Sequence, residues 1–295
     1  MRKKCLLYNK IIFLKSDDQK KLTTGIQLFG LVLANNIEHY EFQNETSPFD
    51  LYSALINTMR NPSKLVHAPG AEVVGMLMKN VNTLCKEDKD VCVAVEAVLL
   101  QTLKELDISL YITNVHRIQL NFPAIVDTQK SILVYHLPKL CGEFRLMCAE
   151  SILARADLLE DHFFAASSFT DMIERRESSS LQLVCLRMIY EHFLSKQKKL
   201  HEDPSLLDQI ESEMMRMFSS LCDEFVKHSS VACRYQLMLI LILAFDIQDS
   251  RKDMSSVNAI SVRKLTNETL LKALLDEGNF RFFKCNQIRC LFPPL

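Results

Sequence analysis

Two glycine pairs have the spacing of a loop that cradles phosphate. Gly25 and Gly30 are separated by four residues, and Gly70 and Gly75 repeat that spacing. A phosphate-binding loop of this kind needs lysine and then serine or threonine directly after the second glycine, to contact phosphate and magnesium. Neither pair is followed by lysine. The pairs therefore predict no nucleotide site, and they indicate small residues that let two helices approach closely.

One tripeptide is similar to the start of a kinase catalytic loop. In that loop the catalytic base is an aspartate at the third position, whereas His116-Arg117-Ile118 has isoleucine there. The eight histidines form no His-Glu-x-x-His motif and do not pair with cysteines at zinc-finger spacing. The sequence therefore predicts a non-enzyme with no catalytic, cofactor-binding or metal-binding residues. An enzyme whose polar groups converge inside an irregular helical bundle stays open as an alternative.

Composition limits the possible partners and folds. The 35 lysines and arginines nearly cancel the 36 aspartates and glutamates, so the whole surface cannot grip nucleic acid or an anionic membrane by charge. Six glycines and eight prolines provide few of the tight turns that sheets require. The longest apolar run, Leu237–Phe245, is about half of the roughly 20 residues that span a bilayer. We expect a helical protein without a membrane segment.

The ten cysteines do not form a disulfide or zinc pattern. Cys85 and Cys92 lie seven positions apart, as do Cys141 and Cys148, which is the spacing of core residues on one helix. No Cys-x-x-Cys motif occurs. The spacing predicts buried free thiols, and hence an intracellular reducing compartment.

Capping residues mark several helix starts. Ser16 and Gln19 have the spacing of a capping box, in which each side chain satisfies a backbone donor of the first turn. Ser47, Asn61 and Asp203 each precede a proline, which is tolerated at the first helical position because its missing N–H would be unpaired there. These signals predict that helices begin at each of these points.

Apolar residues recur with the period of a helix along most of the chain, and no segment has the alternation of a strand. Besides the helices that follow the proline starts, such segments span residues 17–34, 87–105, 108–121, 124–137, 143–156, 158–175, 179–197, 230–247 and 256–276. Many short helices with brief connections predict an all-α fold, a HEAT-like helical-repeat solenoid of about six or seven helical hairpins. An irregular helical bundle is the alternative.

The domain organisation follows from the same pattern. No break in composition divides the chain, so residues 1–295 are expected to form a single helical-repeat array. Both ends carry apolar segments, whereas a solenoid normally ends in polar capping repeats. The chain is therefore expected to be a fragment of a longer solenoid.

A resemblance to a known family is strongest over Asn61–Lys79. This stretch resembles the helical cradle of the family of DNA-dependent protein kinase catalytic subunits, which are phosphoinositide-3-kinase-like kinases. Three further landmarks follow in the same order, namely Asn121–Pro123, Leu137–Lys139 and Leu274–Asn279. The resemblance covers the chain from about residue 50 to 295, and residues 1–47 are not placed by it.

The resemblance implies a non-catalytic scaffold segment of a very large nuclear Ser/Thr kinase. Such kinases are recruited by the Ku heterodimer to DNA ends and serve double-strand break repair by non-homologous end joining. Protein partners are expected for the segment, and direct contact of the segment with nucleic acid stays open. The alternative function is a free-standing HEAT or armadillo-type adaptor that binds a protein or peptide partner.

Overall fold

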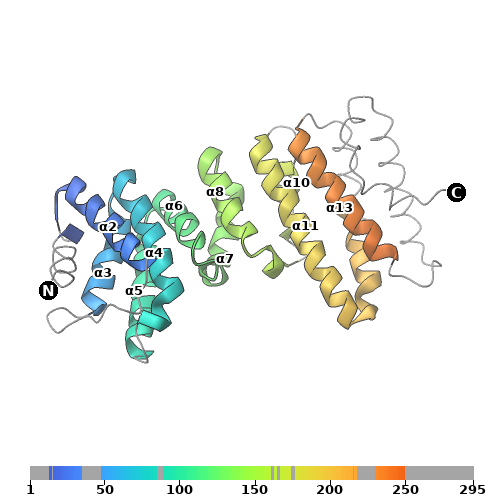
Figure 1. Cartoon of the computed structure of the whole chain (residues 1–295). Coiled ribbons are helices and arrows are strands. Elements are labelled where there is room, and N and C mark those ends of the chain that lie inside the picture. Colours follow the sequence, from blue (N-terminus) through green and yellow to red (C-terminus); the bar gives the residue numbers. More distant parts are fainter. Residues whose placement is uncertain are drawn as a thin grey trace. The chain divides into compact units, whose positions relative to one another are not determined.

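The structure is a computed structural model in which all regular elements of the described residues are helical (Figure 1). Those residues contain α-helices and short 3-10 helices, with no strand. The all-α prediction is therefore confirmed for this part of the chain. The structure describes residues 13–14, 16–34, 48–84, 89–160, 163–164, 167–173, 177–214, 216–217 and 230–249.

The chain divides into two compact units between Arg155 and Ala156. The single array expected over residues 1–295 stays a prediction. The first unit contains α2 (Gln19–Ala34), α3 (Pro48–Asn57), η2 (Thr58–Arg60), α4 (Lys64–Leu84), α5 (Lys89–Glu105), α6 (Ile108–Gln119), α7 (Ile125–His136), η3 (Leu137–Lys139) and α8 (Gly142–Leu153).

Within the first unit, the most extensive contacts join helices that are two places apart in the chain. Helices α2, α4, α6 and α8 stack in that order into one layer, and α3 packs against α5 beside it (Figure 1). Helix α7 contacts both α6 and α8. This stacking is that of a helical-repeat array, in which each hairpin buries its apolar stripe against the next. The predicted HEAT-like repeat fold is confirmed.

The stack is held by apolar side chains at helical spacing. Val74 and Leu77 on α4 are fully buried, as is Ile118 on α6. Burying one such side chain contributes about 1.5–3 kcal/mol. The α4–α6 interface therefore contributes much of the stability of the first unit.

The second unit is built around its longest helix, α11. This helix packs along α13 and also contacts α10 and η4. Phe163, Phe164 and Phe169 form an aromatic cluster beside it, with ring centroids 5.1–5.2 Å apart. The described elements of the unit are η4 (Ala156–Leu158), the helical residues 163–164, α10 (Ser167–Ile173), α11 (Ser179–Glu202), η5 (Pro204–Leu206), the helical residues 207–214 and 216–217, and α13 (Val231–Asp249).

The start of α2 differs from the capping-box prediction. Helix α2 begins at Gln19 because Asp18 is its cap, and the Asp18 Oδ1 atom accepts a hydrogen bond from the Lys20 amide at 2.9 Å. Ser16 accepts instead from the amide of Asp18, at 3.2 Å, in the turn before the helix. Two consecutive polar turns, rather than one capping box, therefore lead into this helix.

The proline starts were predicted with mixed success. Helix α3 begins at Pro48 as predicted, and Asp203 caps the turn that begins at Pro204, where its Oδ1 accepts from the Ser205 amide. The prediction at Asn61 was wrong by two residues, since α4 begins only at Lys64. The Asn61 side chain accepts from the amide of Ser63, at 2.9 Å, and so shapes the turn that precedes the helix.

Two further predicted helices, over 158–175 and 256–276, differ in how the structure bears on them. The predicted helix over 158–175 starts too early, because residue 158 ends η4 and residues 159–160 are not helical. Residues 163–164 and α10 (Ser167–Ile173) are helical. The predicted helix over 256–276 lies outside the described residues.

Proline 69 lies in the interior of α4, where it removes one helical hydrogen bond. The amide of residue 69 would donate to the carbonyl of Leu65, four positions earlier. In its place, the hydroxyl of Thr23 on α2 donates to the Leu65 carbonyl at 3.3 Å. The neighbouring helix α2 thus supplies the hydrogen-bond donor that proline removes from α4.

This arrangement predicts a coupling between two substitutions. Thr23→Val removes the donor while keeping the shape, and is expected to lower the free energy of unfolding by about 0.5–1 kcal/mol. Pro69→Ala restores a helical N–H for the Leu65 carbonyl, so in that background Thr23→Val is expected to cost almost nothing. Hydrogen exchange of peptides from α4 measures both effects. Equal costs of Thr23→Val in the two backgrounds would rule out the bridge.

Candidate functional site

The glycines that have phosphate-loop spacing lie inside helices and serve packing. Gly25 and Gly30 are buried on α2, and Gly70 and Gly75 are buried on α4. A Cβ atom on Gly75 would lie 2.5 Å from the carbonyl oxygen of Ile118 on the facing helix. The glycines therefore allow close helix contact, as the sequence predicted.

The tripeptide that is similar to a kinase loop lies on α6 and links two helices of the layer. The Nε2 atom of His116 lies 2.8 Å from the Glu150 carboxylate on α8. Asn114, on the same helix, donates to the carbonyl of Met59 at 3.1 Å. These polar groups join neighbouring repeats, which is a structural use of residues that could otherwise do chemistry.

Further buried polar groups stabilise the contact between α6, α7 and α8. The hydroxyl of Tyr111 donates to Gln129 Oε1 at 3.0 Å. Burial, and to a smaller extent the nearby Cys148, raises the pKa of the Tyr111 phenol far above its usual value. Burial also raises the pKa of the Cys148 thiol to about 12, and this thiol donates to the carbonyl of Leu133. Both groups stay protonated at neutral pH, which makes them unsuited to act as nucleophiles.

The second unit contains a buried ionic cluster. The Glu213 side chain is 3% exposed, and it contacts two side chains of α11. Its Oε1 atom lies 3.2 Å from the Nε2 atom of His192, and its Oε2 atom bonds the Nζ atom of Lys196. The His192 ring also packs on Phe164, with centroids 4.3 Å apart. The cluster fastens residues 207–214 to α11.

The residues that the structure describes include potential metal-ligand side chains and free thiols. In that part of the chain, no three His, Cys, Asp or Glu side chains gather closely enough to hold a metal ion. Five of the ten cysteines are free thiols there, namely Cys92, Cys141, Cys148, Cys185 and Cys233. The reducing compartment inferred from cysteine usage stays a prediction. Among the described helices, none combines the length and the apolar character that crossing a membrane requires.

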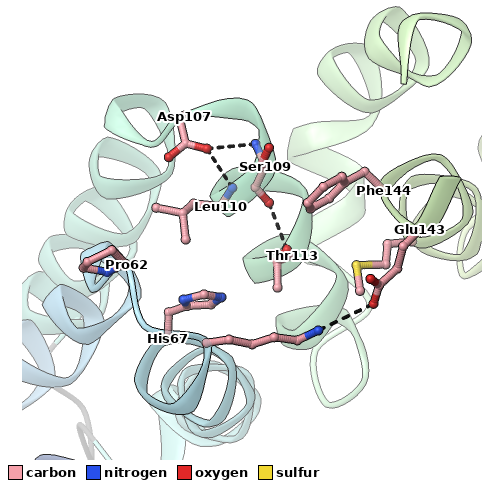
Figure 2. A pocket seen from close by; sticks show the side chains of 10 residues that line it. Pro62, His67, Asp107, Ser109, Leu110, Thr113, Glu143 and Phe144 are labelled. Atoms are coloured by element: carbon pink, nitrogen blue, oxygen red, sulfur yellow. Dashed lines mark hydrogen bonds and ion pairs between the residues drawn. The ribbon is translucent and has the colours of Figure 1, made fainter. Parts of the chain in front are cut away.

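An open pocket of about 330 Å³ lies where α4, α6 and α8 begin (Figure 2). Because these helices are neighbours in one layer, their first turns meet at the same edge. The polar lining includes Lys64 and His67 from α4, Asp107 from the cap of α6, and Glu143 from α8. The apolar lining includes Pro62, Leu110, Phe144 and Met147.

The polar groups of this pocket differ in how they are held. His67 is only 6% exposed, and its Nδ1 atom lies 3.0 Å from the carbonyl oxygen of Asn61. The Oδ1 atom of Asp107 accepts from two amides of α6, both at 3.0 Å. Lys64 and Glu143 form a loose pair at 3.6 Å, with both side chains 63% exposed. The pocket thus combines the buried His67 ring with two exposed carboxylates, of which Asp107 is held by the α6 amides and Glu143 pairs loosely with Lys64.

Sequence reasoning missed this pocket. Its lining residues come from three helix starts that lie far apart in the chain, and none of them forms a recognisable motif. The available signal was the register of the helix starts, because helices two places apart in a repeat array begin at the same edge.

Comparison with known proteins identifies the family. The family described as "DNA-PKcs, CC5" matches residues 3–285 of this chain. The chain is 27% identical over 271 residues to the mouse protein named DNA-dependent protein kinase catalytic subunit, and 28% identical over 270 residues to the dog protein of that name. Each alignment covers 90% of this chain, whereas the chain spans only 6% of each relative.

A designed armadillo repeat protein is among the similar solved structures, with a TM-score of 0.47 and 12% identity over 79% of this chain and 98% of that protein. The repeat fold assigned above rests on the packing of the helices themselves. The resemblance that Asn61–Lys79 and the later landmarks carry is confirmed by the family match. This helical chain belongs to the DNA-PKcs CC5 family.

Proposed function

We propose that this chain is a non-catalytic scaffold segment of a DNA-dependent protein kinase catalytic subunit. The observation that carries the proposal is that the residues with the spacing of catalytic or phosphate-binding motifs serve helix packing instead. Gly75 makes room for the Ile118 backbone, and His116 bonds Glu150 between repeats. Residues used in this way hold neighbouring helices in register, as expected of a scaffold segment. The family match supports the proposal, because it assigns the same stretch to that kinase.

A scaffold segment contributes to function by fixing the relative positions of the parts that it connects. In a repeat array each hairpin contacts only its neighbours, so the positions of distant parts depend on every interface between them. The α2–α4–α6–α8 layer provides such a series of interfaces. The segment therefore keeps distant parts of the kinase in place and offers helix faces and edges to protein partners.

The proposal extends to the cellular role that the names of the relatives suggest. The chain works in the nucleus, within a kinase that the Ku heterodimer brings to DNA ends, and it thereby serves non-homologous end joining. Catalysis belongs to other parts of that kinase. The chain itself needs no cofactor for its task.

Two measurements test this function. Disrupting the gene is expected to reduce the joining of linear DNA in cells to the level of cells that lack Ku. The purified 295-residue chain is expected to bind no ATP and to transfer no phosphate. Normal end joining after disruption would contradict the repair role. Phosphate transfer that persists after contaminating kinases are removed would contradict the scaffold role.

A further inference from the structure

The pocket at the starts of α4, α6 and α8 contains a histidine side chain, mostly buried, with one ring nitrogen that no described protein group uses. His67 is 6% exposed, and its Nδ1 atom faces the carbonyl oxygen of Asn61. Since a carbonyl can only accept, Nδ1 is the donor and carries the ring proton. In the neutral ring Nε2 is then an acceptor. Nε2 has no partner among the described residues, and the ring lies in the pocket (Figure 2).

The other charged groups of the pocket are mainly acceptors as well. Asp107 uses only its Oδ1 atom for the two α6 amides, which leaves Oδ2 available. Glu143 is 63% exposed, and its only described partner is Lys64, at a distance beyond hydrogen-bond length. The lining therefore carries two carboxylates against one ammonium group. The two carboxylates also offset the partial positive charge at the starts of α6 and α8.

The apolar part of the lining suits a long side chain that ends in a planar cation. Leu110 and Met147 provide apolar surface for a methylene stem. Phe144 is 37% exposed in the same pocket, where its ring face can receive a guanidinium group. Arginine combines such a stem with five donors and no acceptor. A lysine ammonium group has fewer donors and no planar face to stack.

We propose that this pocket binds an arginine side chain presented by a partner protein. The guanidinium group donates to His67 Nε2 and to the Glu143 carboxylate, with Asp107 as a further acceptor, and it stacks on Phe144. Lys64 competes with the ligand for Glu143. The proposal names the chemistry of one partner contact of the scaffold, and in that sense it rests on the proposed function.

The test uses the full chain and small probes in an NMR titration. The Met147 methyl group and the His67 ring nitrogens are monitored during addition of N-acetyl-arginine methylamide. The matched probe is the citrulline derivative, which has a similar shape but no charge, and inorganic phosphate serves as an anionic probe. We expect saturable shifts at both residues with the arginine probe, and none with the other two.

Substitutions at the two members of the exposed Lys64–Glu143 ion pair are expected to change the affinity for the arginine probe in opposite directions. Glu143→Gln is expected to weaken binding of the arginine probe by on the order of tenfold, because it removes a charge-assisted hydrogen bond. Lys64→Gln is expected to tighten binding by a few fold, because it frees the carboxylate. Glu96→Gln, an exposed change on α5 outside the pocket, is the control and should leave binding unchanged.

Several results would overturn the arginine proposal. These are the absence of saturable shifts, equal binding of the citrulline probe, binding of phosphate instead, or weaker binding by Lys64→Gln. The titration measures binding of the probes to the isolated chain alone. It can therefore fail while the end-joining test of the proposed function succeeds, and the reverse also holds.

Discussion

Replacing Glu213 by alanine is expected to lower the free energy of unfolding of the second unit by about 3–5 kcal/mol. Glu213 is the carboxylate that contacts both His192 and Lys196, and its side chain is 3% exposed. The Lys196 side chain is itself only 14% exposed. Removal of the carboxylate therefore takes a close counter-charge away from an ammonium group that has little access to solvent, and this lost ion pair is the main source of the destabilisation.

Hydrogen exchange of peptides from α11 and from residues 207–214 measures this loss without interference from the first unit. Glu191→Ala is the matched control, because Glu191 is an exposed carboxylate on α11. The control should change stability by less than about 0.5 kcal/mol. A loss below about 1 kcal/mol for Glu213→Ala would show that the ionic cluster does not hold this unit together.

Gly75→Ala is expected to destabilise the first unit by about 2 kcal/mol, even though alanine is the better helix former. The added methyl carbon would lie 2.5 Å from the Ile118 carbonyl oxygen and 3.1 Å from its Cα atom. Both are backbone atoms, so no rotamer change can relieve the contact. The α4 and α6 helices must move apart, which loosens their buried apolar interface.

Gly30→Ala provides the comparison, because the added Cβ atom meets a side chain instead. It would lie 2.9 Å from the Val73 Cγ2 atom. Val73→Ala is therefore expected to recover much of the loss caused by Gly30→Ala, whereas Ile118→Ala should not recover that of Gly75→Ala. The test compares the unfolding free energies of Gly30→Ala and Gly75→Ala, each with and without the second substitution, as measured by hydrogen exchange in α4. Recovery of Gly75→Ala by Ile118→Ala would mean that the helices do not meet at the backbone.

Helix content and order could be predicted from the sequence because they depend on local periodicity. The apolar spacing over 108–121 predicted α6 closely, and that over 179–197 predicted the start of α11, which continues to Glu202. Helix starts were predicted less well where several capping residues compete. At α2, both Ser16 and Asp18 accept backbone hydrogen bonds, and the later of the two sets the boundary.

Features that depend on packing between repeats could not be predicted. The bond from Thr23 to the Leu65 carbonyl joins residues 42 positions apart, and the sequence carries no signal for it. His67 likewise belongs to a pocket whose other walls come from α6 and α8. Such contacts follow from the register between helices, which periodicity within one helix does not determine.

The central claim is that this chain is a structural segment of a DNA-dependent protein kinase catalytic subunit. The most direct measurement is to tag the gene at its natural locus and to isolate the native polypeptide on linear DNA. We predict that the retained polypeptide contains this sequence together with kinase activity, that retention requires Ku, and that circular DNA retains none. Recovery of the sequence only as a polypeptide of about 34.0 kDa, without kinase activity and without retention on DNA ends, would contradict the account and support a free-standing adaptor.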